Sequence, residues 1–298
     1  MQFEIKPVTL DDKPIFDRYF SENDGINSEY TFTNMFMWRK SYSIRYAIID
    51  GFLCVFSKHH KSPETVNFPL GKGDITPVIT KLIEYFEEIN QKMLIRIYSD
   101  DEISRLENAF PKAFILTEDR NSFDYVYKVQ DLIELSGNRY HQKRNHINKF
   151  LSLYPYEYHN ADDKYLSLCY EMFNRWCESK TDTIPGIWEQ HEAVTELFSN
   201  LDTLNVKGGL ILSEGKVVAF SFGEVLSQKK SVAVIHIEHA DTDFQGSFPL
   251  INQQFLENEW QAFEFVNREE DMGLSGLRKA KKSYHPEFMV KKYIASLK

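Results

Sequence analysis

The order of predicted elements occurs twice in this sequence. Residues 3–128 predict a strand, two helices, the two strands of a hairpin, a helix, a strand, a helix and a closing pair of strands. Residues 154–296 predict nearly the same order again, with two helices before a hairpin and a long strand after it. Asp50-Gly51 and Glu214-Gly215 mark the hairpin turns, because an acidic residue followed by glycine suits a tight turn. The chain must therefore adopt a fold that can be built twice from one plan.

This repeat predicts an α/β (α+β) fold made of two domains, each with a mixed central sheet. A chain of 298 residues is long for one compact domain but gives two domains enough residues to bury a core each. No low-complexity linker separates the halves, and the pattern changes near residues 129–137. We therefore expect one domain at residues 1–130 and a second at residues 131–298.

The N-terminal region and the hydropathy predict a cytoplasmic protein. Charged residues at positions 4, 6, 11 and 12 interrupt the apolar run that a secretion signal requires. No stretch approaches the roughly 20 apolar residues needed to span a bilayer, so we expect no integral membrane association. Cys54, Cys169 and Cys177 lack the spacing of a disulfide framework or a zinc site, and we expect no metal.

Basic residues are concentrated in two short segments of an acidic chain. The formal net charge is -9, yet residues 139–150 carry +4 and residues 278–298 carry +6, so the remainder carries -19. A protein that coats nucleic acid is usually basic overall, whereas this concentration favours one anionic ligand held at one place.

Three segments carry a resemblance to a known family. They are LSGNRYHQKRNHINKF at residues 135–150, HIEHADTDFQGSFPLINQQFL at residues 236–256 and NREEDMGLSGLRKAKKSYHPEFMVKKY at residues 267–293. The sequence resembles a bacterial family grouped with the C-terminal domain of phosphatidylglycerol lysyltransferase, and more distantly the Fem-type peptidyltransferases. The resemblance implies two tandem GNAT-like domains, GNAT being the fold of acyl-CoA N-acyltransferases.

The same resemblance implies an acyl or aminoacyl transferase that acts on an amine. The donor would be acyl-CoA, as a co-substrate, or an aminoacyl-tRNA. Lysyltransferases also carry a large membrane-embedded region with no counterpart in this sequence, so the resemblance leaves the acceptor open.

Lys143 and Arg144 lie in the first basic segment. In the helix expected there, Tyr140, Ile147 and Leu151 share one face, and the two cations lean toward either side of it. Their stems could cover apolar surface, or Arg144 could pair with a buried carboxylate. Alternatively, both cations hold an anionic ligand, since arginine suits bidentate contacts with phosphate or carboxylate.

The second basic segment places Lys281 and Tyr284 on the apolar face of a helix that begins near Ser275. Lys281 either meets a carboxylate such as Asp271 or projects into a ligand cleft. Arg278 of the same helix is a further candidate for binding the anion.

Gln245, Gly246 and Ser247 precede a helix that continues through residue 255. By resemblance to GNAT enzymes, the amides at this helix start would bind the pyrophosphate of an acyl-CoA, because glycine allows close approach and the helix dipole favours an anion. In the alternative interpretation, Gly246 is only a turn residue before a capped helix.

Acyl transfer to an amine needs an acceptor for the amine proton and a donor for the leaving group. His236 and Glu238 alternate onto the same face of the long strand at residues 231–240, and either could take the amine proton. By resemblance to GNAT enzymes, Tyr284 would be the general acid. Without catalysis, Glu238 would be a strand-end salt bridge and His236 a core histidine.

Two functions follow from these expectations. In the first, the domain at residues 131–298 is catalytic and the N-terminal domain is a non-catalytic copy. In the second, the protein is a non-catalytic binding module whose cleft, lined by Lys143, Arg144 and Lys281, senses an anionic metabolite. The net charge disfavours tRNA, although the two basic segments could form a local footprint for an acceptor stem.

Overall fold

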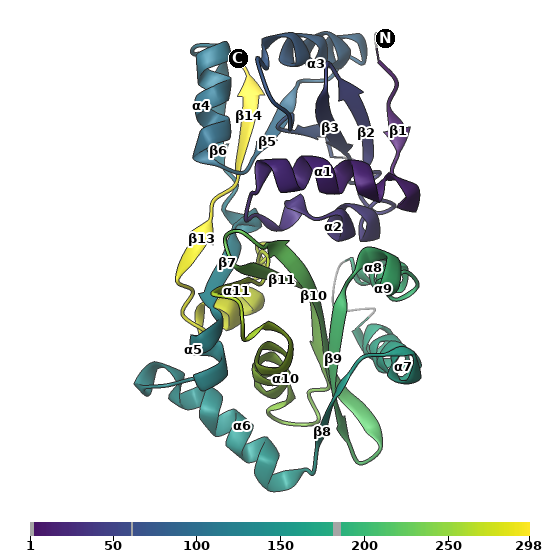
Figure 1. The fold of residues 1–298 in the computed structure, drawn as a ribbon, viewed down its shortest axis with the longest axis vertical. Coiled ribbons are helices and arrows are strands. Elements are labelled where there is room, and N and C mark those ends of the chain that lie inside the picture. Colours follow the sequence, from purple (N-terminus) through teal and green to yellow (C-terminus); the bar gives the residue numbers. More distant parts are fainter. Residues whose placement is uncertain (1–2, 61, 181–185) are drawn as a thin grey trace. The chain divides into compact units, whose positions relative to one another are not determined.

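The computed structural model describes residues 3–60, 62–180 and 186–298, and the chain divides into two compact units (Figure 1). The first unit comprises Met1–Asp124, Glu270–Gly273 and Val290–Lys298, and the second comprises Tyr125–Glu269 and Leu274–Met289. Each unit is built on a seven-stranded sheet. No helix in the described ranges combines the length and the apolar character needed to cross a bilayer.

The sheet of the first unit has the order β1-β2-β3-β4-β5-β14-β6 and is antiparallel except for the parallel pair β4 and β5. Its strands are β1 (Lys6–Pro7), β2 (Arg45–Ile49), β3 (Phe52–Ser57), β4 (Thr65–Asn67), β5 (Leu94–Ile97), β6 (Phe114–Glu118) and β14 (Tyr293–Leu297). Its main helices are α1 (Lys13–Asn23), α2 (Phe32–Met37), α3 (Thr76–Glu88) and α4 (Asp100–Ala109). On one face, α3 buries Ile79 and Leu82 against the sheet. On the other, Phe16 of α1 packs its ring against Tyr46 of β2.

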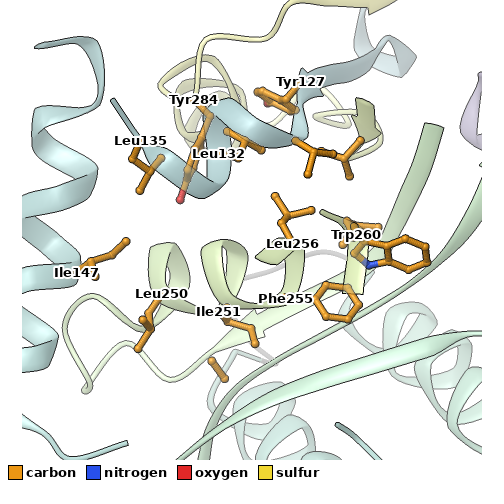
Figure 2. Packing of buried hydrophobic residues seen from close by; sticks show 14 of the residues in the cluster. Tyr127, Leu132, Leu135, Ile147, Leu250, Ile251, Phe255, Leu256, Trp260 and Tyr284 are labelled. Atoms are coloured by element: carbon orange, nitrogen blue, oxygen red, sulfur yellow. The ribbon is translucent and has the colours of Figure 1, made fainter. Parts of the chain in front are cut away.

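The sheet of the second unit has the order β13-β7-β12-β11-β10-β9-β8, and β11 and β12 are parallel. Its strands are β7 (Asp124–Lys128), β8 (Glu157–Asn160), β9 (Lys207–Ser213), β10 (Lys216–Ser227), β11 (Val232–Ala240), β12 (Phe265–Asn267) and β13 (Phe288–Val290). Its helices are α5 (Val129–Glu134), α6 (His141–Leu153), α7 (Asp163–Lys180), α8 (Ile187–Phe198), α9 (Leu201–Leu204), α10 (Ser247–Phe255) and α11 (Ser275–Lys282). Figure 2 shows α10 with Leu250 and Ile251 in the apolar cluster that also contains Leu132 and Ile147. α7 and α8 cover the other face, where Phe173 contacts Phe220.

The predicted repeat is present in both units. β4-α3-β5 and β11-α10-β12 are each two parallel strands joined by a helix that covers the sheet. Both predicted hairpins are confirmed: Asp50 and Gly51 have φ of 50° and 81°, and Glu214 and Gly215 have φ of 51° and 74°. Two consecutive positive φ values are what a type I′ turn requires.

The last strand of each half of the chain joins the sheet of the other unit. β7 ends the N-terminal half but pairs with β12, and the C-terminal β14 lies between β5 and β6. The domains expected from the sequence, residues 1–130 and 131–298, instead place β7 in the N-terminal domain and β14 in the C-terminal domain. Sequence patterns predict that a segment is a strand but not its partner, because neighbours in the chain are usually, though not always, neighbours in the sheet.

Candidate functional site

The first basic segment and residues 278–289 of the second lie side by side in the second unit. Tyr140, just before α6, donates its hydroxyl hydrogen bond to the carbonyl of Tyr284, just after α11, at 3.1 Å. Nε2 of His285 lies 3.2 Å from the carbonyl oxygen of Arg139, and the rings of Tyr140 and His285 meet edge to face with centroids 5.5 Å apart. These contacts place the N-terminus of α6 directly against the end of α11.

Lys143 lies over the ring of Tyr284 at this junction. Its Nζ is 3.7 Å from the ring centroid, a distance at which the cation is attracted to the aromatic face. Among the described residues, none accepts a hydrogen bond from Nζ. Burial, with a smaller effect from the nearby Arg268 guanidinium, lowers the pKa of Lys143 to about 8. Lys143 therefore presents an ammonium group that donates no hydrogen bond within the described part of the chain.

Arg268 follows β12 and approaches the same ring. Its Cζ lies 4.8 Å from the centroid of Tyr284, and its Nη2 donates to Oε1 of Glu238 at 2.7 Å. Its Nη1 is buried and has no hydrogen-bond partner in the described part of the chain. Burial raises the pKa of the Tyr284 phenol, although the Arg268 guanidinium opposes this rise, so the phenol is protonated at neutral pH.

The Glu238 carboxylate bridges two diverging strands. β11 and β12 pair only from Val232 to Val234 of β11. Further along, Glu238 on β11 reaches Arg268 beyond the end of β12. Asn252 of α10 donates its amide to Oε2 of Glu238 at 3.1 Å. The Glu238 side chain keeps 13% of its surface exposed, so the carboxylate is within reach of solvent.

His236 is not placed as the strand alternation predicts. Phe222 of β10 lies opposite Ile237, and Gly223 lies opposite Ile235, so His236 is the extra residue of a β-bulge. Its side chain therefore does not share the alternation of Glu238 along the strand, and it contacts a different set of residues.

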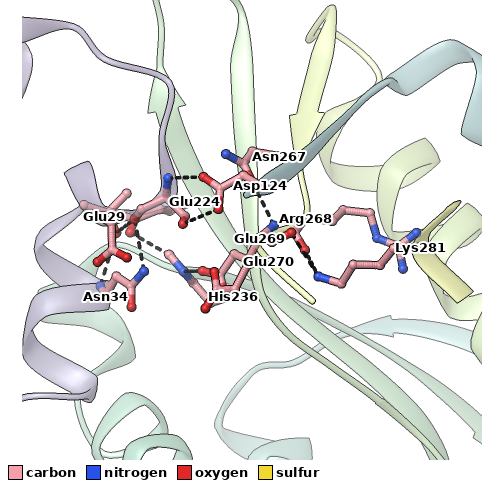
Figure 3. A network of polar contacts seen from close by, with 12 residues as sticks. Glu29, Asn34, Asp124, Glu224, His236, Asn267, Arg268, Glu269, Glu270 and Lys281 are labelled. Atoms are coloured by element: carbon pink, nitrogen blue, oxygen red, sulfur yellow. Dashed lines mark hydrogen bonds and ion pairs between the residues drawn. The ribbon is translucent and has the colours of Figure 1, made fainter. Parts of the chain in front are cut away.

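Two carboxylates hold the His236 ring (Figure 3). Nδ1 lies 2.9 Å from Glu269 and Nε2 lies 2.8 Å from Glu224. Burial lowers the pKa of His236, but these two hydrogen bonds outweigh it and raise the pKa to about 9. Both ring nitrogens are therefore held by carboxylates, and neither is free to accept a proton from an amine in this arrangement.

Arg144 and Lys281 both bind backbone carbonyls. Nη1 of Arg144 donates to the carbonyls of Leu135 and Gly137, the latter at 2.7 Å. Nζ of Lys281 donates to the carbonyl of Arg268 and, at 3.1 Å, to that of Glu269 (Figure 3). Lys281 therefore supports the segment that carries Arg268. Arg278 is half-buried on α11, and its role in anion binding stays a prediction.

Gly246 is explained by packing against α6. Its φ is 100°, and a Cβ at this position would lie 2.2 Å from the carbonyl oxygen of His146. The Ser247 amide donates to the carbonyl of Phe244 at 3.0 Å, the Ser247 hydroxyl donates to the carbonyl of Asp241 at 2.8 Å, and Pro249 has no N–H. Much of the donor capacity at the start of α10 is therefore unavailable to a pyrophosphate. Gln245 is exposed in the preceding turn.

Comparison with known proteins identifies the family of this chain. The family model described as phosphatidylglycerol lysyltransferase, C-terminal, matches residues 24–296. The chain belongs to the phosphatidylglycerol lysyltransferase C-terminal family. The suspected grouping is thus confirmed.

Two relatives and one fold neighbour of this family member are informative. A crystal structure of a conserved protein of unknown function from Bacteroides thetaiotaomicron is 33% identical, covers 100% of both chains and has a TM-score of 0.92. The uncharacterized protein MYCGA3080 of Mycoplasmoides gallisepticum is 25% identical over 183 residues, and the match spans 59% of this chain and 57% of that protein. A tandem GNAT protein from the clavulanic acid biosynthesis pathway is 7% identical, covers 99% of this chain and 98% of its own, and has a TM-score of 0.53. The predicted tandem GNAT-like fold is therefore confirmed.

In the first unit of this lysyltransferase-family chain, the gap beyond the parallel strands is filled. Tyr98, after β5, donates its hydroxyl to Oδ1 of Asn67 at the end of β4 at 2.9 Å. Glu102 accepts hydrogen bonds from the hydroxyl of Tyr30 and, at 2.8 Å, from the amide of Tyr98. All four side chains are buried. In the first unit, the position that corresponds to Glu238 and Arg268 of the second unit is thus filled by side chains that bond to one another.

Sequence reasoning missed Arg268, Asn252, Glu224 and Glu269 of this family member. Arg268 and Glu269 lie in the NREED run that the resemblance quotes, immediately after a short central strand. Ligands bind beyond the carboxyl ends of parallel strands, so a charged pair at that position was a usable signal. Asn252 and Glu224 gave no such signal, because their roles depend on partners far along the chain.

Proposed function

We propose that the second unit transfers an aminoacyl group from an aminoacyl-tRNA to an amine. The observation that carries this proposal is the pair of cations on the ring of Tyr284: Lys143 at 3.7 Å and Arg268 at 4.8 Å. Arg268 already neutralises Glu238, so the group of three charges keeps a net positive charge. An anionic group of the donor would bind there, with Nζ of Lys143 and Nη1 of Arg268 as hydrogen-bond donors.

In the proposed transfer, Glu238 and Tyr284 each carry out one proton transfer. The amine nitrogen attacks the acyl carbonyl carbon, a C–N bond forms, and the C–O bond of the ester breaks. Glu238 takes the proton that leaves the nitrogen, and Tyr284 gives its proton to the leaving oxygen. The Tyr284 phenol is protonated at neutral pH, and the phenolate formed in this step would be stabilised by Lys143 and Arg268.

The start of α10 supports an aminoacyl-tRNA over an acyl-CoA. A pyrophosphate needs several free amides at a helix N-terminus. Here the Ser247 amide is already bonded, and the residue at 249 is proline. Gly246 is in contact with α6 and leaves no room on that side of the turn. Lys143 and Arg268 lie elsewhere in the unit and suit an anion that approaches beside Tyr284.

The filled gap of the first unit supports a non-catalytic role for that unit. Tyr98 donates hydrogen bonds to both Asn67 and Glu102 there, so these side chains are engaged with one another and not with a ligand. The catalytic assignment therefore rests on the second unit, as the sequence predicts.

Binding and transfer by the full chain and two matched variants test the proposal. Thermal shifts are measured with acetyl-CoA, desulfo-CoA, uncharged tRNA and aminoacyl-tRNA, and transfer of radiolabelled amino acids to amines is followed separately. Lys143→Gln removes the cation on Tyr284, and Lys149→Gln removes an exposed lysine of the same helix as the control. We expect Lys143→Gln to weaken binding of aminoacyl-tRNA about ten-fold and to reduce transfer, with Lys149→Gln close to wild type.

Three outcomes contradict the proposal. Equal losses in both variants would mean that general charge, and not the site beside Tyr284, attracts the tRNA. Stabilisation by acetyl-CoA but not by tRNA would assign the donor to the acyl-CoA class. Binding that depends on Lys143 without turnover would favour the non-catalytic binding module.

A further inference from the structure

Buried polar atoms without partners gather around Glu238. Ser221 Oγ, Asn252 Oδ1 and Arg268 Nη1 are each buried and have no hydrogen-bond partner in the described part of the chain. Asn252 and Arg268 donate to Glu238 with their other nitrogens. Ser221 lies directly opposite Glu238 in the ladder of β10 and β11, so both side chains project from the same face of the sheet.

A buried polar atom needs a hydrogen-bond partner, and the described residues supply none for these three. A single atom of this kind has many explanations, but three atoms on the neighbours of one carboxylate point to a common cause. A group from outside the chain would satisfy them together. It would reach them past Glu238, the partly exposed member of the group.

The chemistry of the atoms limits what this group can be. Glu238 accepts from Asn252, which fixes the amide nitrogen toward the carboxylate and leaves Oδ1 as an acceptor. Ser221 Oγ can also accept, and Glu238 keeps unused lone pairs, so the side chains around Glu238 offer three acceptors. A primary ammonium has three N–H donors, whereas a hydroxyl has one and a water has two. The chain's own Lys143 lies on the ring of Tyr284 and donates no hydrogen bond to these atoms.

We infer that Ser221, Glu238 and Asn252 form a binding site for a primary ammonium group. Nη1 of Arg268 carries two N–H groups: one would contact a carbonyl oxygen of the same ligand, and the other the anionic group of the donor. The identity of the ligand rests on the proposed function: the ammonium belongs either to the α-amino group of the aminoacyl donor or to the acceptor amine.

Saturation-transfer NMR on the full chain at pH 7 tests this site with three small probes. L-Alaninamide carries an ammonium next to a carbonyl, N-acetyl-L-alaninamide lacks the ammonium, and n-butylamine lacks the carbonyl. We expect the wild type to bind at least one amine about ten-fold or more tightly than the acetylated probe. Ser221→Ala and Asn252→Leu should each remove that preference.

Stability separates loss of the site from loss of the fold. The Ser221 hydroxyl bonds no described atom of the protein, so Ser221→Ala should leave the melting temperature unchanged or raise it. The control is Ser247→Ala, since Ser247 is equally buried but donates to the Asp241 carbonyl at 2.8 Å. This control should lower the melting temperature and leave the affinity for amines unchanged.

The probes also identify the source of the ammonium. Tighter binding of L-alaninamide than of n-butylamine assigns the site to the donor's α-amino group, and equal binding assigns it to the acceptor. Wild-type affinity for amines in both Ser221→Ala and Asn252→Leu would overturn the site, as would equal binding of the acetylated probe. In that case a continued loss of tRNA binding in Lys143→Gln would leave the proposed function standing.

Discussion

The pH dependence of anion binding should report the ionisation of Lys143. Burial and Arg268 lower the pKa of this ammonium to about 8, and the group lies over Tyr284 with no carboxylate of the described residues in an ion pair with it. An anion binds the protonated form, so affinity should be highest below pH 8 and should fall as the pH rises through this value. With a pKa of about 8, the protonated fraction falls from about nine-tenths at pH 7 to about a tenth at pH 9. The affinity should therefore fall about ten-fold over this range.

The assay is titration of the full chain with uncharged tRNA at constant ionic strength, because phosphodiesters do not titrate between pH 7 and pH 9. Lys143→Arg is the informative variant, since a guanidinium stays charged over the whole range. Its affinity should change little with pH. Lys149→Gln, which removes a charge from the same helix, should keep the wild-type slope. A flat wild-type curve, or an unchanged slope in Lys143→Arg, would refute the role of Lys143.

Three further predictions concern the stability of each unit, measured by urea unfolding. Gly246→Ala should cost more than about 2 kcal/mol, because its Cβ would meet a backbone carbonyl, whereas Gly215→Ala, with positive φ but open space around it, should cost about 1 kcal/mol. Lys292→Met should cost about 3–5 kcal/mol at pH 7, because it leaves the buried Asp124 carboxylate without the ammonium now 2.8 Å away. The pKa of His236 is raised to about 9, so its contribution is complete below about pH 6 and lost as the pH rises through 9. The stability advantage of wild type over His236→Gln should shrink by about 3 kcal/mol between pH 6 and pH 9.

Local features of the fold could be predicted from the sequence, and features that depend on distant partners could not. Asp50-Gly51 and Glu214-Gly215 fix their hairpins through the conformations of two adjacent residues. The exchange of β7 and β14 between the sheets has no local signature, because each is an ordinary strand wherever it pairs. The prediction that Leu151 lies on the buried face of its helix was also wrong, because Leu151 is 47% exposed and Phe150 is the buried residue.

The candidate site divides in the same way. The helix pattern predicted that Lys143 and Tyr284 face the protein, and in the structure Lys143 lies over the ring of Tyr284. The prediction that side chains alternate between the two faces of the strand failed at His236, because a β-bulge adds one residue to β11. A periodic sequence pattern does not predict a bulge. Arg144 and Lys281 lean inward as expected, but they bind backbone carbonyls, which the sequence pattern cannot distinguish from a ligand.

The two units differ in chemistry at one shared feature of the backbone. Both sheets contain a parallel pair that diverges past a few residues, and the gap must be filled by side chains or by a ligand. In the first unit, Asn67, Tyr98 and Glu102 close it with hydrogen bonds that they exchange or receive from nearby groups. In the second unit, Glu238 and Arg268 close it only in part, because Nη1 of Arg268 has no hydrogen-bond partner among the described residues. A substrate bound at the second gap would gain hydrogen bonds that the first gap does not offer, and this difference supports our proposal that the second unit carries the chemistry.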